Sequence, residues 1–321
     1  ATGYTSIDNI GTSLLLAVPA YTNVTFKGTE FDNVISFNYQ LYTSPWSQMG
    51  SLNFEGCTFK GLIVGAVASQ AMAFSGCTFE SFTNTDYANN SNPIWVRPAY
   101  GNWTKDDNEG QGGNFKSLTT ITFKDNNVTS TRPVKFEYIS QWDITSTVTA
   151  TGNTFDITAQ DGDTIIKNVG LYLGAHTDEN EFNLVVDNNT KSENTAALYT
   201  IPEGKTSLPV GSTVTDTNGN PVELKDALKW KAADAEQDKI VLKTVTAVAS
   251  IGETTFATVA DAIAAAKDGD TVTLLADVTE DVVVDKSITL DLGGKTLTNT
   301  NKGKATISVT SGATATVKNG N

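Results

Sequence analysis

The sequence is poor in cysteine, histidine, arginine and proline, and these shortages exclude several classes of protein. Its 321 residues contain 2 Cys, 1 His and 8 Pro, and its only arginines are Arg97 and Arg132. Two cysteines are too few for a disulfide-rich scaffold or for a zinc site built from cysteine ligands. A single histidine excludes most metal and acid–base sites that depend on imidazole. Two arginines leave few positions that can hold a phosphate through paired hydrogen bonds.

Positive charge and long apolar runs are scarce as well. The chain has 22 Lys and Arg against 36 Asp and Glu, which gives a formal net charge of −14. Such a chain has no clustered cations to neutralise phosphates, so we expect no nucleic-acid partner. No stretch reaches the roughly 18 apolar residues of a membrane helix, so we expect no membrane span. The first residues, ATGYTSIDN, lack the pattern of a leader, and we expect either a removed leader or an excised piece of a longer chain.

One eight-residue phrase recurs five times in the first half of the chain. Residues 24–31, 52–59, 72–79, 121–128 and 148–155 read VTFKGTEF, LNFEGCTF, MAFSGCTF, ITFKDNNV and VTATGNTF. Alternation places the two leading apolar residues on one face of a short strand. The Gly or Asp at the fifth position permits a bend, after which an apolar residue returns inward. The phrases start 28, 20, 49 and 27 residues apart, and we interpret the gap of 49 as two units, one of them degenerate.

A unit of 20–28 residues with about three short strands cannot bury its own apolar face. Stacking such units about 4.8 Å apart buries a continuous apolar column. The predicted core ladder comprises Phe26, Phe31, Phe54, Cys57, Phe59, Phe74, Cys77, Phe79, Phe123 and Phe155. For the two cysteines, which share one phrase position, we expect inward thiols, with a disulfide as the open alternative. Residues 20–190 thereby resemble the pectate-lyase-like superfamily, which implies an all-β fold, a right-handed parallel β-helix.

The last 70 or so residues follow a different pattern. The stretch FATVADAIAAAKDGD has apolar residues at helical spacing, with Thr258 as N-cap, Lys267 in the last turn and Gly269 just beyond. The segments after it alternate and break at Gly or Asn, as strands do. A short helix leading into such strands resembles the N-terminal cap of a secreted pectate-lyase-like β-helix. This kind of segment is frequent in large surface and adhesin-like proteins of gut Gram-positive bacteria.

Three regions are therefore expected. Residues 1–194 form the later coils of a parallel β-helix, and residues 195–245 form a cap or connector with short strands and a short helix near Leu224 to Lys231. Residues 246–321 form the N-terminal cap and first coils of a second β-helix, with the capping α-helix near 258–267. Both ends of the chain interrupt the coil pattern. This suits either a fragment of a longer repetitive protein or subunits that stack end to end through residues 1–30 and 285–321.

Relatives of this fold include polysaccharide lyases and glycoside hydrolases, but their full motif set is missing here. The Gly-His-Gly and Arg-x-Lys motifs of polygalacturonase-like members do not occur, and His176 lies in GAHTDEN instead. We expect Arg132, which precedes Pro133, at the surface or in a turn, because arginine is mostly exposed. We expect no catalytic, cofactor or metal site. Calcium in the acidic run of residues 106–109 is not supported by EF-hand spacing.

A long loop between residues 79 and 121 holds the candidates for binding a glycan or protein partner. They are Trp95, Arg97, Tyr100, Trp103, Asp106 and Asp107. Aromatic rings beside carboxylates suit stacking on sugars and hydrogen bonds to hydroxyls, and the alternative is a solvated loop whose rings pack back on the column.

Taken together, the sequence predicts an extracellular bacterial surface protein with a structural or adhesive, non-enzymatic role. One alternative is a subunit of a head-to-tail filament formed by end-to-end stacking of copies. The other is a polysaccharide-binding module or a polysaccharide-active enzyme. The expected partners are a second copy of the chain, or a host or microbial glycan or protein.

Overall fold

The fold consists of two units built mainly from parallel strands. The first unit comprises Ala1–Leu208 and Thr213–Lys243, and the second comprises Pro209–Ser212 and Thr244–Asn321. The computed structural model of the chain describes residues 23–31, 35–37, 49–60, 63–66, 69–80, 94–97, 120–139, 145–158, 168–175, 181–202, 205, 207–229, 239–242 and 245–320. The predicted all-β class with a short helix is confirmed, and the stacked parallel strands are compatible with a β-helix.

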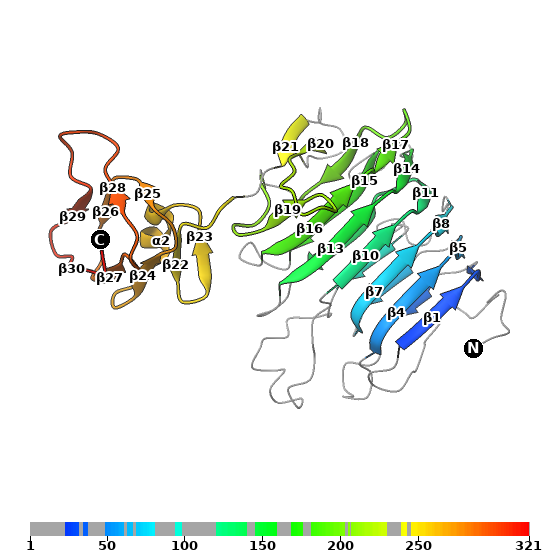
Figure 1. The fold of residues 1–321 in the computed structure, drawn as a ribbon, viewed down its shortest axis with the longest axis horizontal. Helices are drawn as coiled ribbons and strands as arrows, with labels where there is room; N and C mark the ends of the chain where they lie inside the picture. Colours follow the sequence, from blue (N-terminus) through cyan, green and yellow to red (C-terminus); the bar gives the residue numbers. More distant parts are fainter. Residues whose placement is uncertain are drawn as a thin grey trace. The chain divides into compact units, whose positions relative to one another are not determined.

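Every third strand of the first unit belongs to the same sheet, so the chain visits three sheets in turn (Figure 1). We call one such passage a coil. The seven-stranded sheet contains β1 (Asn23–Lys27), β4 (Met49–Glu55), β7 (Ser69–Ser75), β10 (Thr120–Lys124), β13 (Ser146–Thr151), β16 (Phe182–Asp187) and β19 (Thr213–Thr215). The six-stranded sheet contains β2 (Glu30–Phe31), β5 (Thr58–Phe59), β8 (Thr78–Phe79), β11 (Asn127–Ser130), β14 (Thr154–Ile157) and β17 (Thr190–Lys191).

The third sheet of this unit has eight strands and ends in an antiparallel pair. Its strands are β3 (Ile35–Phe37), β6 (Ile63–Ala66), β9 (Ile94–Arg97), β12 (Val134–Ile139), β15 (Val169–Ala175), β18 (Ala197–Thr200), β20 (Leu224–Leu228) and β21 (Lys239–Leu242). Strand β21 runs antiparallel to β20, which stops the parallel stacking at that edge. The short helix expected near Leu224 to Lys231 is wrong for Leu224–Leu228, because these residues form β20 and pair with β18.

The register between coils shows that the 49-residue gap is one coil, not two. Strand β7 pairs directly with β10, with Met72 opposite Ile121 and Phe74 opposite Phe123. Strand β8 likewise pairs with β11. A parallel ladder fixes only the paired strands, so the chain between them can lengthen without breaking the stack.

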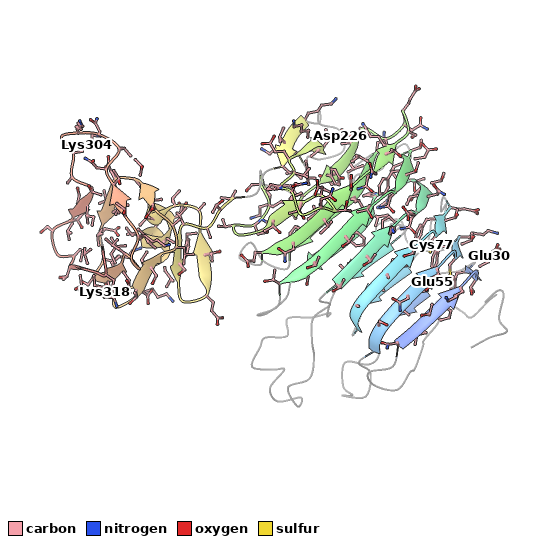
Figure 2. The ribbon with its side chains drawn as sticks, viewed as in Figure 1. Glu30, Glu55, Cys77, Asp226, Lys304 and Lys318 are labelled. Carbon is pink, nitrogen blue, oxygen red and sulfur yellow. The ribbon has the colours of Figure 1, made fainter. Side chains whose placement is uncertain are left out.

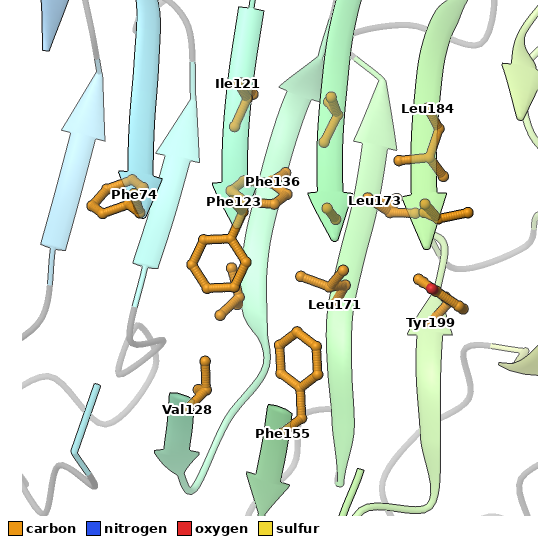
Figure 3. Close-up of a cluster of buried hydrophobic side chains, with 14 of the residues drawn as sticks. Phe74, Ile121, Phe123, Val128, Phe136, Phe155, Leu171, Leu173, Leu184 and Tyr199 are labelled. Carbon is orange, nitrogen blue, oxygen red and sulfur yellow. The ribbon is translucent and has the colours of Figure 1, made fainter. Parts of the chain in front are cut away.

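Aromatic rings at equivalent positions stack along the column of the first unit. The rings of Phe54 and Phe74 lie 4.9 Å apart with an interplanar angle of 9°, and those of Phe59 and Phe79 repeat this geometry at 4.9 Å. Phe26 continues the first of these stacks above Phe54 and is only partly buried. The other predicted ladder residues are buried, namely Phe31, Phe54, Cys57, Phe59, Phe74, Cys77, Phe79, Phe123 and Phe155. Figure 3 shows how Phe74, Phe123 and Phe155 gather with the aliphatic side chains of later coils.

The second unit contains one described helix and a smaller stack of coils. Helix α2 (Val259–Ala265) follows β22 (Ala249–Ile251) and β23 (Thr254–Phe256). The coil strands are β24 (Thr271–Leu274), β25 (Val278–Thr279), β26 (Val282–Val284), β27 (Ile288–Asp291), β28 (Leu297–Thr298), β29 (Ile307–Val309) and β30 (Ala315–Lys318). Strands β24, β27 and β30 are parallel neighbours, while β22 pairs antiparallel with both β23 and β24.

The ends of helix α2 are held partly by residues that helical periodicity does not reveal. The Thr258 side chain accepts a hydrogen bond from the Asp261 N–H at 3.0 Å, as an N-cap does. The Glu280 carboxylate, one coil further, accepts from the N–H groups of Val259 and Ala260. The expected Lys267 is not in the last turn, which contains no basic residue. Instead the Lys286 ammonium donates to the carbonyl of Ile263 at 3.0 Å and to the next one, near the helix C-terminus.

Candidate functional site

The most continuous polar feature of the first unit is a row of side chains at the bend between its seven-stranded and six-stranded sheets. We call this row the turn ladder. It comprises Thr29, Cys57, Cys77, Asn126, Asn153 and Asn189, one from each of six consecutive coils.

Each ladder residue follows a residue with left-handed backbone. These preceding residues are Gly28, Gly56, Gly76, Asp125, Gly152 and Asn188, whose φ angles lie between 53° and 67°. Glycine adopts this conformation without strain, and Asp and Asn tolerate it better than other residues. The left-handed residue turns the chain sharply, so the next side chain points back into the stack of coils, where four of the six ladder residues are at most 1% exposed.

The asparagines connect each coil to the one before it through two kinds of hydrogen bond. Asn153 shows the pattern, because its side-chain oxygen accepts the Asn126 N–H at 3.0 Å and its side-chain nitrogen donates to the Phe123 carbonyl at 2.8 Å. Asn126 does the same, accepting the Cys77 N–H at 2.9 Å and donating to the Phe74 carbonyl at 3.1 Å.

The last asparagine of the ladder repeats this arrangement and adds a tyrosine. Asn189 accepts the Asn153 N–H at 3.1 Å and donates to the Ala150 carbonyl at 2.7 Å. Its side-chain nitrogen also lies 3.2 Å from the Tyr199 hydroxyl. Each asparagine therefore satisfies one donor and one acceptor that the bend withdraws from the sheets, where an unpaired buried group is costly.

The cysteines occupy the ladder in the second and third coils and make weaker contacts. The Cys57 thiol donates to the Phe26 carbonyl, and the Cys77 thiol donates to the Phe54 carbonyl, both at 3.5 Å. These are the carbonyl positions that asparagine side chains reach in later coils. Both cysteines are free and buried, and Cys77 lies at the bend after β7 (Figure 2). The hydrogen bond with Cys57, together with burial, raises the pKa of the Cys77 thiol.

The predicted partner-binding residues fall mostly outside the described part of the chain. Trp95 and Arg97 belong to strand β9, where Trp95 is opposite Val64 and Lys135 in neighbouring coils. Tyr100, Trp103, Asp106 and Asp107 lie outside the described residues, as does His176. The structure thus places two of the six candidates on a strand of the eight-stranded sheet.

Arg132 lies in a bend, as one of the two expectations had it, but it is buried rather than at the surface. It occupies the bend between β11 and β12, with a relative exposure of 6%, and its backbone N–H donates to the Ser130 hydroxyl at 3.2 Å. Proline at position 133 is buried too, so the bend itself folds inward rather than out to solvent.

Asp156, on strand β14, is bonded to a turn of the next coil. The Asp156 carboxylate accepts from the Ser192 hydroxyl at 2.5 Å and from the Asn194 side-chain amide at 3.0 Å, which together hold the pKa of Asp156 below its usual value. Over the residues that the structure describes, no three His, Cys, Asp or Glu side chains are grouped to share a metal ion. No described helix is long and apolar enough to cross a membrane.

The turn ladder occupies the sixth position of the repeated phrase, for which alternation alone predicts no role. That position reads Thr, Cys, Cys, Asn, Asn along the five phrases, and residues 184–191, LVVDNNTK, supply a sixth member, Asn189. The signal was an asparagine or small polar residue directly after a turn residue, recurring with the coils.

Comparison with protein-family models, with curated proteins and with solved structures gave no match. The likeness to pectate-lyase-like proteins therefore remains an expectation from the repeat phrase.

Replacing Asn153 with alanine will destabilise the first unit strongly. The change removes an acceptor from the Asn126 N–H and a donor from the Phe123 carbonyl, both buried. Each unsatisfied buried group costs roughly 1–3 kcal/mol, so we expect a loss of about 2–5 kcal/mol in urea unfolding. The matched control is Asn194→Ala at an exposed position, for which we expect less than about 1 kcal/mol. Equal midpoints for both variants would contradict a structural role for the ladder.

Proposed function

We propose that this chain is an extracellular structural or adhesive protein of a bacterial surface, built on a right-handed, closed parallel β-helix. The observation that carries the proposal is the turn ladder, which joins consecutive coils by side-chain hydrogen bonds from Cys57 to Asn189. Its role is mechanical and non-enzymatic: a stiff column that holds other groups away from the cell.

Stiffness of this kind follows from three parallel rows of contacts along one axis. Backbone hydrogen bonds pair each strand with the next coil, aromatic rings stack inside, and ladder side chains join the bends. A break in one row leaves the other two in place. Repeat stacks are stabilised mainly by such nearest-neighbour interfaces, so additional coils lengthen the column without altering its design.

The outward face of the seven-stranded sheet offers a neutral surface for a partner. Threonines stand in rows there, with Thr120 opposite Thr147 and Thr122 opposite Thr149 in the next coil. Farther along, the Thr213 hydroxyl donates to the Asn183 side chain at 2.6 Å. Short hydroxyl and amide groups of this kind form hydrogen bonds with glycans and proteins alike, which suits an adhesive role.

An antibody raised against the chain tests the proposed location. We expect it to label intact cells of the source bacterium, and we expect brief protease treatment of those cells to remove the signal. A cytoplasmic protein labelled in parallel controls for leakage. Labelling seen only after permeabilisation would exclude a surface role.

A second candidate function, a head-to-tail filament, is favoured by the coil that β28, β29 and β30 form in the second unit. Val309 and Val317 are 48% and 47% exposed, although their register partners in the preceding coil, Val284 and Leu290, are fully buried. The same coil is basic, since residues 292–321 contain four lysines and no acid; Lys304 and Lys318 are labelled in Figure 2. Lysines repel the same coil of a second copy and favour contact with a different, acidic part of it. Such a head-to-tail contact builds a filament when its rotation does not close a ring.

Electron microscopy and sedimentation of the purified chain test this candidate. We expect concentration-dependent filaments from the native chain and a monomer from the double variant Val309→Asp, Val317→Asp. The matched control carries Ser308→Asp and Thr316→Asp on the alternate positions of the same strands, and we expect it to assemble. A native chain that stays monomeric at high concentration removes the candidate.

A further inference from the structure

The register of the coils brings the two cysteines to neighbouring positions, at a spacing that a disulfide can bridge. The residues on either side of them are in register between consecutive coils, with Glu55 opposite Ser75 and Thr58 opposite Thr78. Neighbouring parallel strands lie about 4.8 Å apart, and the Cα atoms of bonded cysteines lie about 4.4–6.8 Å apart. The cysteines lie in the bend, where the backbone geometry departs from that of the flat strand ladder.

The thiols contact each other and hold nothing else that a disulfide would disturb. The two thiols interact, which shifts the pKa of each, and each thiol also donates to two backbone carbonyls, at 3.5 and 3.6 Å. A thiol is a weak donor, so losing these four contacts costs little. The backbone bond from the Thr78 N–H to the Cys57 carbonyl at 2.9 Å, and the bond from the Cys77 N–H to Asn126, involve no sulfur and remain.

From this juxtaposition we propose that Cys57 and Cys77 are a modification site: they form a disulfide that links the second and third coils in an oxidising environment. The proposal rests on the extracellular location proposed above. The bond closes a loop of 20 residues and adds a covalent link to the part of the turn ladder that has no asparagine.

The reaction is an exchange with a low-molecular-weight disulfide. With Cys57 as the first nucleophile, Cys57 releases its proton to solvent, and its thiolate attacks one sulfur of that disulfide, forms a mixed disulfide and expels one small thiolate. Cys77 gives its proton to that thiolate, attacks the Cys57 sulfur and expels the second small thiolate, which takes up a proton from solvent. Two protein thiols are oxidised, and one small disulfide is reduced to two thiols.

Both thiols are buried, so the oxidant reaches them only when the bend after β4 opens, as it does before the coils have stacked during folding. In that open state the interaction between the two thiols, which lowers the pKa of Cys57 and raises the pKa of Cys77, is absent, so either cysteine can attack first.

Refolding of the full chain in a glutathione redox buffer tests the proposal. We expect the native chain, refolded from urea with oxidised and reduced glutathione, to lose both thiols, to lose the mass of two hydrogen atoms and to stay monomeric. We expect its urea midpoint to rise relative to the reduced chain, and a phosphine reductant to reverse both changes. Refolding from urea gives the oxidant access to both thiols, so slow opening of the native bend does not limit the result.

Variants that lack one cysteine distinguish formation of the Cys57–Cys77 disulfide from unspecific oxidation. Cys77→Ser leaves Cys57 without its partner, and we expect it to accumulate a glutathione adduct that the native chain does not retain. Cys57→Ser leaves Cys77 without its partner, and we expect the same kind of stable adduct on it after refolding. A native chain that keeps two free thiols after refolding, or that yields stable adducts or linked dimers, overturns the proposal. If the antibody does not label intact cells, the proposed extracellular location fails, but the refolding result does not change. Failure of the proposed location and failure of the proposed disulfide are therefore distinguishable.

Discussion

The first unit depends on how buried polar groups are satisfied where the chain leaves its seven-stranded sheet. A left-handed residue such as Gly152 turns the backbone there, which withdraws a carbonyl and an N–H from regular sheet pairing. Water does not reach this position, so a side chain must replace the lost partners. Asn153 carries both a donor and an acceptor, and it supplies both at once to the preceding coil. The bend is thereby a link between coils rather than a weak point.

This constraint leaves the rest of each coil free to vary. The ladder partners are separated by 49 residues between Cys77 and Asn126, by 27 between Asn126 and Asn153, and by 36 between Asn153 and Asn189. Their hydrogen bonds nevertheless lie within 2.9–3.1 Å. The ladder hydrogen bonds therefore do not depend on the length of a coil, and insertions can carry partner-binding groups on an unchanged column. The proposed surface role depends on this separation.

Much of the architecture could be predicted from the repeat phrase, because period-two alternation and a left-handed turn residue each impose a local geometry. The stacked phenylalanines and helix α2 follow from such local rules. Features that depend on distant partners could not be read in the same way. The 49-residue coil, the strand Leu224–Leu228 and the buried Arg132 each depend on contacts between coils. The ladder asparagines can be located in the sequence, but their hydrogen bonds join residues 27 to 52 positions apart. No local pattern reveals such contacts.

Amide hydrogen exchange of the native chain tests the ladder most directly. The N–H groups of Cys77, Asn126 and Asn153 lie in bends, where amides ordinarily exchange fast, yet each is donated to an asparagine side-chain oxygen of the next coil. The account predicts that these three amides exchange as slowly as those in the middle of β10 and β13, because both report the same opening of the stack. Exchange at the rate of an unstructured peptide, with the strand amides protected, would contradict it.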